Sequence, residues 1–181
     1  MLRNSSAYYG AMARLLHWGM AALVIALLVG VELHDSFPKG SDLRNAMMNV
    51  HYQFGLLVLL LIWPRLAVVF SDRVPPIRPA PPGWQDVVAK LVHLALYATM
   101  IFLPILGIVM QQAGNHAVSL LGMQLPTLAG VDKTLAKSLR EVHSLVGNVV
   151  IGLIVVHTAA ALWHHYRQHD NTLLRMLPPR H

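Results

Sequence analysis

The 181-residue chain has no cysteine and few charged residues, and each shortage excludes a class of protein. Without cysteine the chain has no disulfide, no cysteine-ligated iron–sulfur cluster and no thioether attachment of a prosthetic group. Lys, Arg, Asp and Glu make up 12% of the residues, against roughly 25% in an ordinary soluble domain. Hydrophobic residues make up 55%. This composition is typical of an integral membrane protein.

Four apolar stretches are long enough to cross a hydrocarbon core of about 30 Å. They run from about Ala11 to Leu33, Ala46 to Phe70, Val87 to Gln111 and Val142 to Trp163. We therefore predict an all-α membrane protein, a four-transmembrane-helix bundle that forms one domain over residues 1–181. The first stretch is longer than the apolar core of about 7–15 residues in a secretory signal, and we expect it to be retained.

The distribution of Lys and Arg predicts the orientation, because cytoplasmic segments carry the excess. The predicted cytoplasmic side comprises the two ends of the chain, the loop after the second stretch and the ends of the stretches that adjoin them. This side holds nine of these residues, and the opposite side holds five. The nine are Arg3, Arg14, Arg65, Arg73, Arg78, Lys90, Arg167, Arg175 and Arg180. Both termini are therefore predicted to be cytoplasmic. The formal net charge of +6 fits this topology and attraction to anionic membrane lipid, and no nucleic-acid-binding motif accompanies it.

Two segments that connect the predicted spans have sequence patterns that predict their local structure. The segment from Val74 to Gly83 contains five prolines, which predicts an extended, semi-rigid spacer. Between Asp132 and Val142, apolar residues recur at intervals of four and three. This spacing predicts an amphipathic interfacial helix that continues into the fourth span.

Histidines are the candidate functional residues of the spans. His143 and His157 are 14 residues apart on the fourth span, so they share a helix face and lie about 21 Å apart along the axis. By depth, His51 matches His143 near the periplasmic side, and His17 matches His157 near the cytoplasmic side. Imidazoles inside a membrane need partners within the protein, and a bundle without a prosthetic group would leave them unexplained.

Two imidazoles at each level suit the two axial positions of a haem iron, whereas zinc would require four ligands at one level. We therefore predict two noncovalent, bis-histidine haems b, with iron ligands His17, His51, His143 and His157. His51 and His143 are each followed four residues later by a glycine, Gly55 and Gly147. A glycine one turn from the ligand leaves room for a macrocycle, although small residues in membrane helices also serve close helix packing.

Other histidines leave alternatives open. His93, near the cytoplasmic end of the third span, competes with His17 for the inner iron. Otherwise it would contact a haem propionate or a quinone, or make a hydrogen bond that packs two helices. His164, His165 and His169 superficially suggest a metal site, but their place at the interface favours a solvated helix end.

Several segments resemble the bacterial cytochrome b561 family. They are the histidine-bearing spans, Glu32–Lys39, Leu103–Gly107 and, most specifically, His164–Met176, so that the resemblance runs nearly end to end. It implies an arrangement similar to the dihaem b-subunits of formate dehydrogenases and nickel–iron hydrogenases. In those subunits the four ligand histidines lie on the first, second and fourth helices, and the same spacing of 14 is implied for the fourth.

The resemblance implies electron transfer between a donor and the quinone pool across the bacterial inner membrane. One branch of the family is described as oxidising superoxide at the periplasmic side and reducing ubiquinone. Lys133, Lys137 and Arg140 form a basic stripe next to His143 that would attract a small anion. The same side chains would otherwise anchor to lipid or to haem propionates.

We therefore favour an oxidoreductase of the superoxide:ubiquinone type that needs no partner protein. The alternative is an electron-transfer subunit that docks a separate redox partner protein, a dehydrogenase or hydrogenase.

Overall fold

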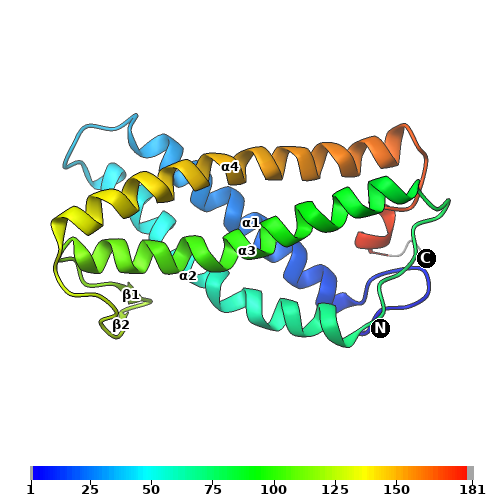
Figure 1. The fold of residues 1–181 in the computed structure, drawn as a ribbon, viewed down its shortest axis with the longest axis horizontal. Helices are drawn as coiled ribbons and strands as arrows, with labels where there is room; N and C mark the ends of the chain where they lie inside the picture. Colours follow the sequence, from blue (N-terminus) through cyan, green and yellow to red (C-terminus); the bar gives the residue numbers. More distant parts are fainter. Residues whose placement is uncertain (1, 179–181) are drawn as a thin grey trace. The chain divides into compact units, whose positions relative to one another are not determined.

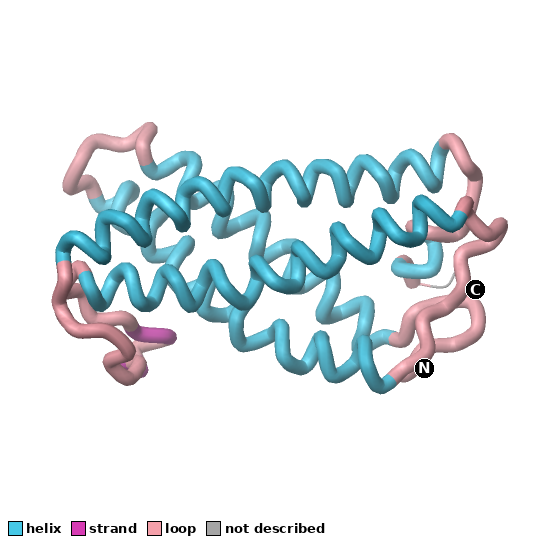
Figure 2. The backbone as a smooth tube through the Cα atoms, viewed as in Figure 1, coloured by secondary structure: helices cyan, strands magenta, loops and turns pink. Residues whose placement is uncertain are grey.

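The computed structural model describes residues 2–178, and most of this part of the chain is helical (Figures 1 and 2). Arg180, which entered the charge comparison, and His181 lie outside the described residues. The long helices are α1 (Ala11–His34), α2 (Asp42–Ser71), α3 (Gly83–Ala113) and α4 (Lys133–Tyr166). A two-stranded hairpin, β1 (Ser119–Leu120) with β2 (Met123–Gln124), and a short 3-10 helix, η1 (Leu174–Met176), complete the elements.

The four helices confirm the predicted spans. Each contains an apolar window long enough to cross a membrane, and at most 17% of the residues in any window are buried inside the protein, which leaves helix surface for contact with lipid. Even α1, the shortest at 24 residues, extends for about 36 Å. All four helices are longer than the apolar stretches alone, because polar end turns keep helical hydrogen bonding.

The fourth helix joins the predicted interfacial segment and the span without a break. It begins at Lys133, and the Asp132 carboxylate accepts hydrogen bonds from the backbone N–H groups of Thr134 and Leu135, at 2.9 and 3.0 Å. Asp132 is therefore the N-cap, which satisfies backbone donors at the start of the helix.

The described residues form two compact units. The first unit comprises residues 2–17, 63–99 and 147–178, and the second comprises residues 18–62 and 100–146. Within the second unit, α1 and α2 approach closely at Gly30, where an added Cβ would lie 3.0 Å from the Met47 carbonyl oxygen. An alanine at this position would press on that carbonyl, so glycine favours the close approach of the two helices.

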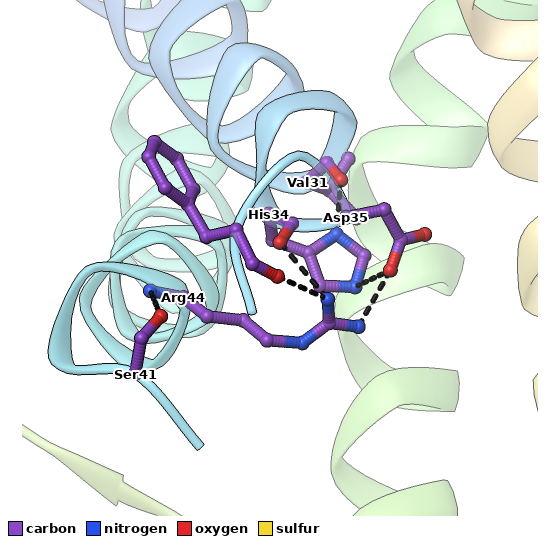
Figure 3. A network of polar contacts seen from close by, with 6 residues as sticks. Val31, His34, Asp35, Ser41 and Arg44 are labelled. Carbon is purple, nitrogen blue, oxygen red and sulfur yellow. Dashed lines mark hydrogen bonds and ion pairs between the residues drawn. The ribbon is translucent and has the colours of Figure 1, made fainter. Parts of the chain in front are cut away.

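Arg44 fastens the turn between α1 and α2 in the second unit (Figure 3). Its guanidinium donates to the carbonyl oxygens of His34 and Phe37, both at 3.1 Å, and to the Asp35 carboxylate at 2.5 Å. The hydrogen bond from Arg44 holds the pKa of Asp35 below its usual value. The carbonyl of His34, the last residue of α1, thus has a donor, as a helix C-terminus requires.

The loop between α3 and α4, also in the second unit, is held by two glutamine side chains. Gln53 of α2 donates to the Ser119 carbonyl at 2.9 Å and accepts from the Leu121 N–H at 2.9 Å. Gln112, which is 7% exposed, bonds in the same two-way manner to the backbone at Pro126 and Leu128. Side chains rather than a regular sheet therefore order this loop.

In the first unit, the proline-rich segment contacts the C-terminal segment. Asn171 exchanges two hydrogen bonds with the backbone of Arg78, at 2.8 and 3.2 Å. The Arg175 side chain donates to the Pro75 carbonyl and lies over the Tyr9 ring. Burial raises the pKa of Tyr9. The predicted spacer is therefore also a packing surface for the end of the chain.

Candidate haem-binding sites

The outer histidine pair lies in the second unit. His51 of α2 and His143 of α4 have ring centroids 6.1 Å apart, with the ring planes at 75°. The His51 Nδ1 lies 3.2 Å from the carbonyl oxygen of Leu27 on α1. When Nδ1–H donates to that carbonyl, the lone pair on Nε2 is free for a metal.

A glycine that sequence reasoning missed lies against His143. A Cβ added at Gly107 of α3 would come 3.4 Å from the His143 Cε1 atom. This separation is near the lower limit of ordinary contact, so glycine gives the ring the room it occupies. The contact joins residues of two different helices, α3 and α4, and no local sequence pattern signals it.

The inner histidines lie in the first unit. His17 of α1 and His157 of α4 have ring centroids 6.3 Å apart, with planes at 70°. His93 of α3 also approaches His157, at 5.3 Å between centroids, and is exposed on its helix. The structure therefore brings three histidines together here and two at the outer pair.

These separations can be compared with what an iron between two axial imidazoles requires. A metal–imidazole bond is about 2 Å long, and the nitrogen lies about 1 Å from the ring centre, so the centroids should be about 6 Å apart. His51–His143 and His17–His157 match this value, whereas His93–His157 is too short. The residues present fit two bis-histidine haems b, and the distances favour His17 over His93 as the fourth ligand.

The glycines of the two His-x-x-x-Gly motifs face open space. A Cβ added at Gly55 or Gly147 meets no atom within 4 Å. Neither glycine is therefore packed against a neighbouring group, and their role beside a macrocycle stays a prediction. The three residues that follow His157 on α4 are also small, and all three are exposed: Thr158, Ala159 and Ala160.

Arg65 of α2 is the second residue that sequence reasoning missed as a site residue. Its Nη2 lies 3.0 Å from the His17 Nδ1, and its guanidinium stacks 5.6 Å from the centre of the Tyr97 ring on α3. The sequence does contain a pattern that could have indicated Arg65 as a site residue. Arg65 follows His51 by 14 residues, the same interval that separates His143 from His157, and therefore lies on the same face of its helix.

The basic stripe, Lys133, Lys137 and Arg140, lies on the first turns of α4 in the second unit. All three side chains are exposed, and none forms an ion pair with any residue in the range 2–178. Their positive charge is therefore available to an anion at the helix end that carries His143.

The expectation of a solvated helix end is wrong for His164. Its Nδ1 lies 2.5 Å from the Asp170 carboxylate, and Asp170 is only 3% exposed. His165 packs edge-on against Tyr166. Among the described residues, no cluster of three or more His, Asp or Glu is arranged to hold a metal ion. His164 therefore links the end of α4 to the C-terminal segment through Asp170.

Membrane-length helices with paired histidines, and no cysteine, define a membrane protein of the cytochrome b class. Comparison with known sequences identifies the family: the chain belongs to the prokaryotic cytochrome b561 family, whose sequence model matches residues 8–179. It is thus a multi-pass protein of the bacterial inner membrane that takes part in electron transfer, and membership implies binding of haem b.

Three curated relatives span nearly the whole chain. Cytochrome b561 homolog 1 of Escherichia coli K12 is 37% identical over 165 residues, 91% of this chain and 94% of the relative. The protein named probable superoxide oxidase CybB of Yersinia pestis is 32% identical, over 90% of this chain and 92% of the relative. Cytochrome b562 of Cereibacter sphaeroides is 28% identical, over 91% and 92%.

Proposed function

We propose that this cytochrome holds two haems b and transfers electrons from periplasmic superoxide to ubiquinone. The observation that carries the proposal is the pair of centroid separations, 6.1 Å for His51–His143 and 6.3 Å for His17–His157. Each haem, when bound, would supply a one-electron carrier. In the overall reaction two superoxide ions each lose one electron and become dioxygen, and ubiquinone takes up those two electrons and two protons.

The outer residues would receive the anionic donor. Lys133, Lys137 and Arg140 carry charge without a carboxylate partner among the described residues, and such charge raises the encounter rate of an anion. The Leu27 carbonyl beside Nδ1 orients the His51 ring, whose Nε2 would be available to hold a haem iron.

The inner residues would serve the quinone side. His93 is exposed on α3 and close to His157, so a lipid-dissolved quinone could approach it from the bilayer. We assign His93 to contact with a quinone carbonyl or a haem propionate. With both termini cytoplasmic, the protons would come from the cytoplasm.

One surface favours the alternative, an electron-transfer subunit with a redox partner protein. Leu121 and Met123 at the tip of the β1–β2 hairpin are 72% and 67% exposed, and exposed apolar residues often mark protein contacts. Similarity to the protein named probable superoxide oxidase CybB supports the superoxide assignment instead. A partner dehydrogenase or hydrogenase remains the second candidate.

Reversing charge in the stripe tests the donor. We expect Lys133→Glu with Lys137→Glu to slow reduction by superoxide several-fold at low salt, since attraction becomes repulsion. Stopped-flow absorbance of the haems gives the rate, and reduction by a neutral quinol should not change. The wild-type rate should fall as salt rises, because the Debye length is about 10 Å at 0.1 M.

Lys39→Glu is the matched control, because Lys39 is an exposed lysine of the same unit outside the stripe. It should leave the superoxide rate close to that of the wild type. Equal rates for the double variant and the wild type at low salt would assign the stripe to lipid or propionate anchoring. Reduction by a dehydrogenase but not by superoxide would establish the subunit function.

A further inference from the structure

Arg65 carries a positive charge inside a membrane-spanning helix, and its environment does not neutralise that charge. It is half-buried on α2, in the first unit, and forms no ion pair within residues 2–178. The acidic residues of that unit interact elsewhere: Asp72 with Asn4, Asp86 with Lys90, and Asp170 with His164. A cation at this depth costs solvation free energy unless it has a partner, so it indicates a functional position.

The contact between Arg65 and His17 is compatible with only one form of the imidazole. A guanidinium has donors and no acceptor, so the His17 Nδ1 at 3.0 Å must accept, and the ring proton must sit on Nε2. Iron binding at Nε2 removes that proton and places one on Nδ1, which then cannot accept from Arg65. When a haem binds, the guanidinium must therefore find another acceptor close by.

The haem itself would bring such an acceptor, since its propionates are carboxylates. Carboxylates are the groups that a guanidinium binds best. The Tyr97 ring, 5.6 Å from the guanidinium carbon, holds the charge next to the inner histidines through a cation–π contact. Arg175, another arginine of this unit, already donates to the Pro75 carbonyl and stacks on Tyr9. Arg65 is thus the residue best placed to bind the haem carboxylate.

We propose that Arg65 is a positioning residue of the inner haem, which pairs with a haem propionate and raises the midpoint potential of that haem. A fixed positive charge beside the iron disfavours the oxidised form, which carries the greater positive charge, so the reduced form is stabilised. Electrons arriving at the outer haem would then be drawn to the inner one. This inference rests on the proposed binding of two haems.

The test is a spectroelectrochemical titration of purified, haem-loaded full-length chain. The inner component is the one lost in His157→Met. Arg65→Gln should lower the midpoint potential of the inner component so that the equilibrium constant for its reduction falls about tenfold, which is 59 mV for one electron. The outer component should not move. Arg65→Lys keeps the charge and should stay close to the wild type.

Arg14→Gln is the matched control, since Arg14 is a half-buried arginine of the same unit that bonds the Leu177 carbonyl instead of a histidine. It should leave both potentials unchanged. An unchanged inner potential in Arg65→Gln with full haem content would overturn the proposal. If Arg65→Gln loses the inner haem, retention of that haem at near-native potential in Arg65→Lys supports the proposal, and its loss there too overturns it. A wild-type chain with fewer than two haems would instead overturn the proposed function.

Discussion

The histidines at the two levels have different neighbours on the ring nitrogen that does not face the iron. At the outer level the His51 Nδ1 lies beside the Leu27 carbonyl, a neutral acceptor fixed in the backbone. At the inner level the His17 Nδ1 lies beside the positively charged guanidinium of Arg65. The two proposed haems should therefore differ in potential, because hydrogen bonding and nearby charge both tune a bound iron.

The pairing of the histidines can be tested one residue at a time. His17→Met should alter the same spectral component as His157→Met, and His51→Met the same component as His143→Met, since the members of a pair share an iron. Low-temperature spectra of the reduced protein resolve the components. If His93→Met altered the inner component as His157→Met does, and His17→Met did not, His93 would be the inner ligand.

Most of the candidate site was predicted from the spacing of residues along single helices. The interval of 14 residues and the depth of each histidine led to both pairs, and the centroid separations agree with them. Gly107 and Asp170 were not predicted, because each acts on a residue of another helix or segment. Contacts of that kind leave no periodic trace in the sequence.

At the scale of elements, the long apolar runs made the helices predictable. The structures of the short polar connections could not be predicted. The spans appear where hydropathy places them, and α4 begins one residue after its cap, Asp132. The β1–β2 hairpin has only two residues in each strand, too few for an alternating pattern. Its order depends on Gln53 and Gln112, whose glutamine side chains give no sign of their partners.

The C-terminal segment should be fastened to α4 by Asp170 in a pH-dependent manner. Burial alone would raise the pKa of Asp170, but hydrogen bonds from His164 and Thr172 outweigh it and hold the pKa below its usual value of 3.8. The folded chain therefore binds this proton more weakly than the unfolded chain. The stabilisation is present above about pH 4 and is lost as pH falls through the lowered pKa.

We expect Asp170→Ala to reduce the free energy of unfolding at pH 7 by about 1–3 kcal/mol, the cost of leaving buried donors without their acceptor. Thermal unfolding in detergent, followed by circular dichroism, measures the change. Asp86→Ala is the control, because Asp86 is exposed and its ion pair with Lys90 should contribute about 0.5 kcal/mol or less. Equal effects of the two substitutions at pH 7 would refute the fastening role of Asp170.

At the scale of the whole molecule, each compact unit contains one histidine pair. His51 and His143 belong to the second unit, and His17 and His157 to the first. A single family model covers residues 8–179 and so includes residues of both units. Membership of the cytochrome b561 family establishes haem-dependent electron transfer, and the number of haems is the central proposal.

The haem content of the purified chain tests that proposal most directly. A pyridine haemochrome assay, normalised to protein by amino-acid analysis, should give two haems b per chain, because two histidine pairs have the separation that an iron requires. His143→Ala should remove the outer haem and His157→Ala the inner one, so that each variant retains one. One haem or none in the wild-type chain would contradict the account.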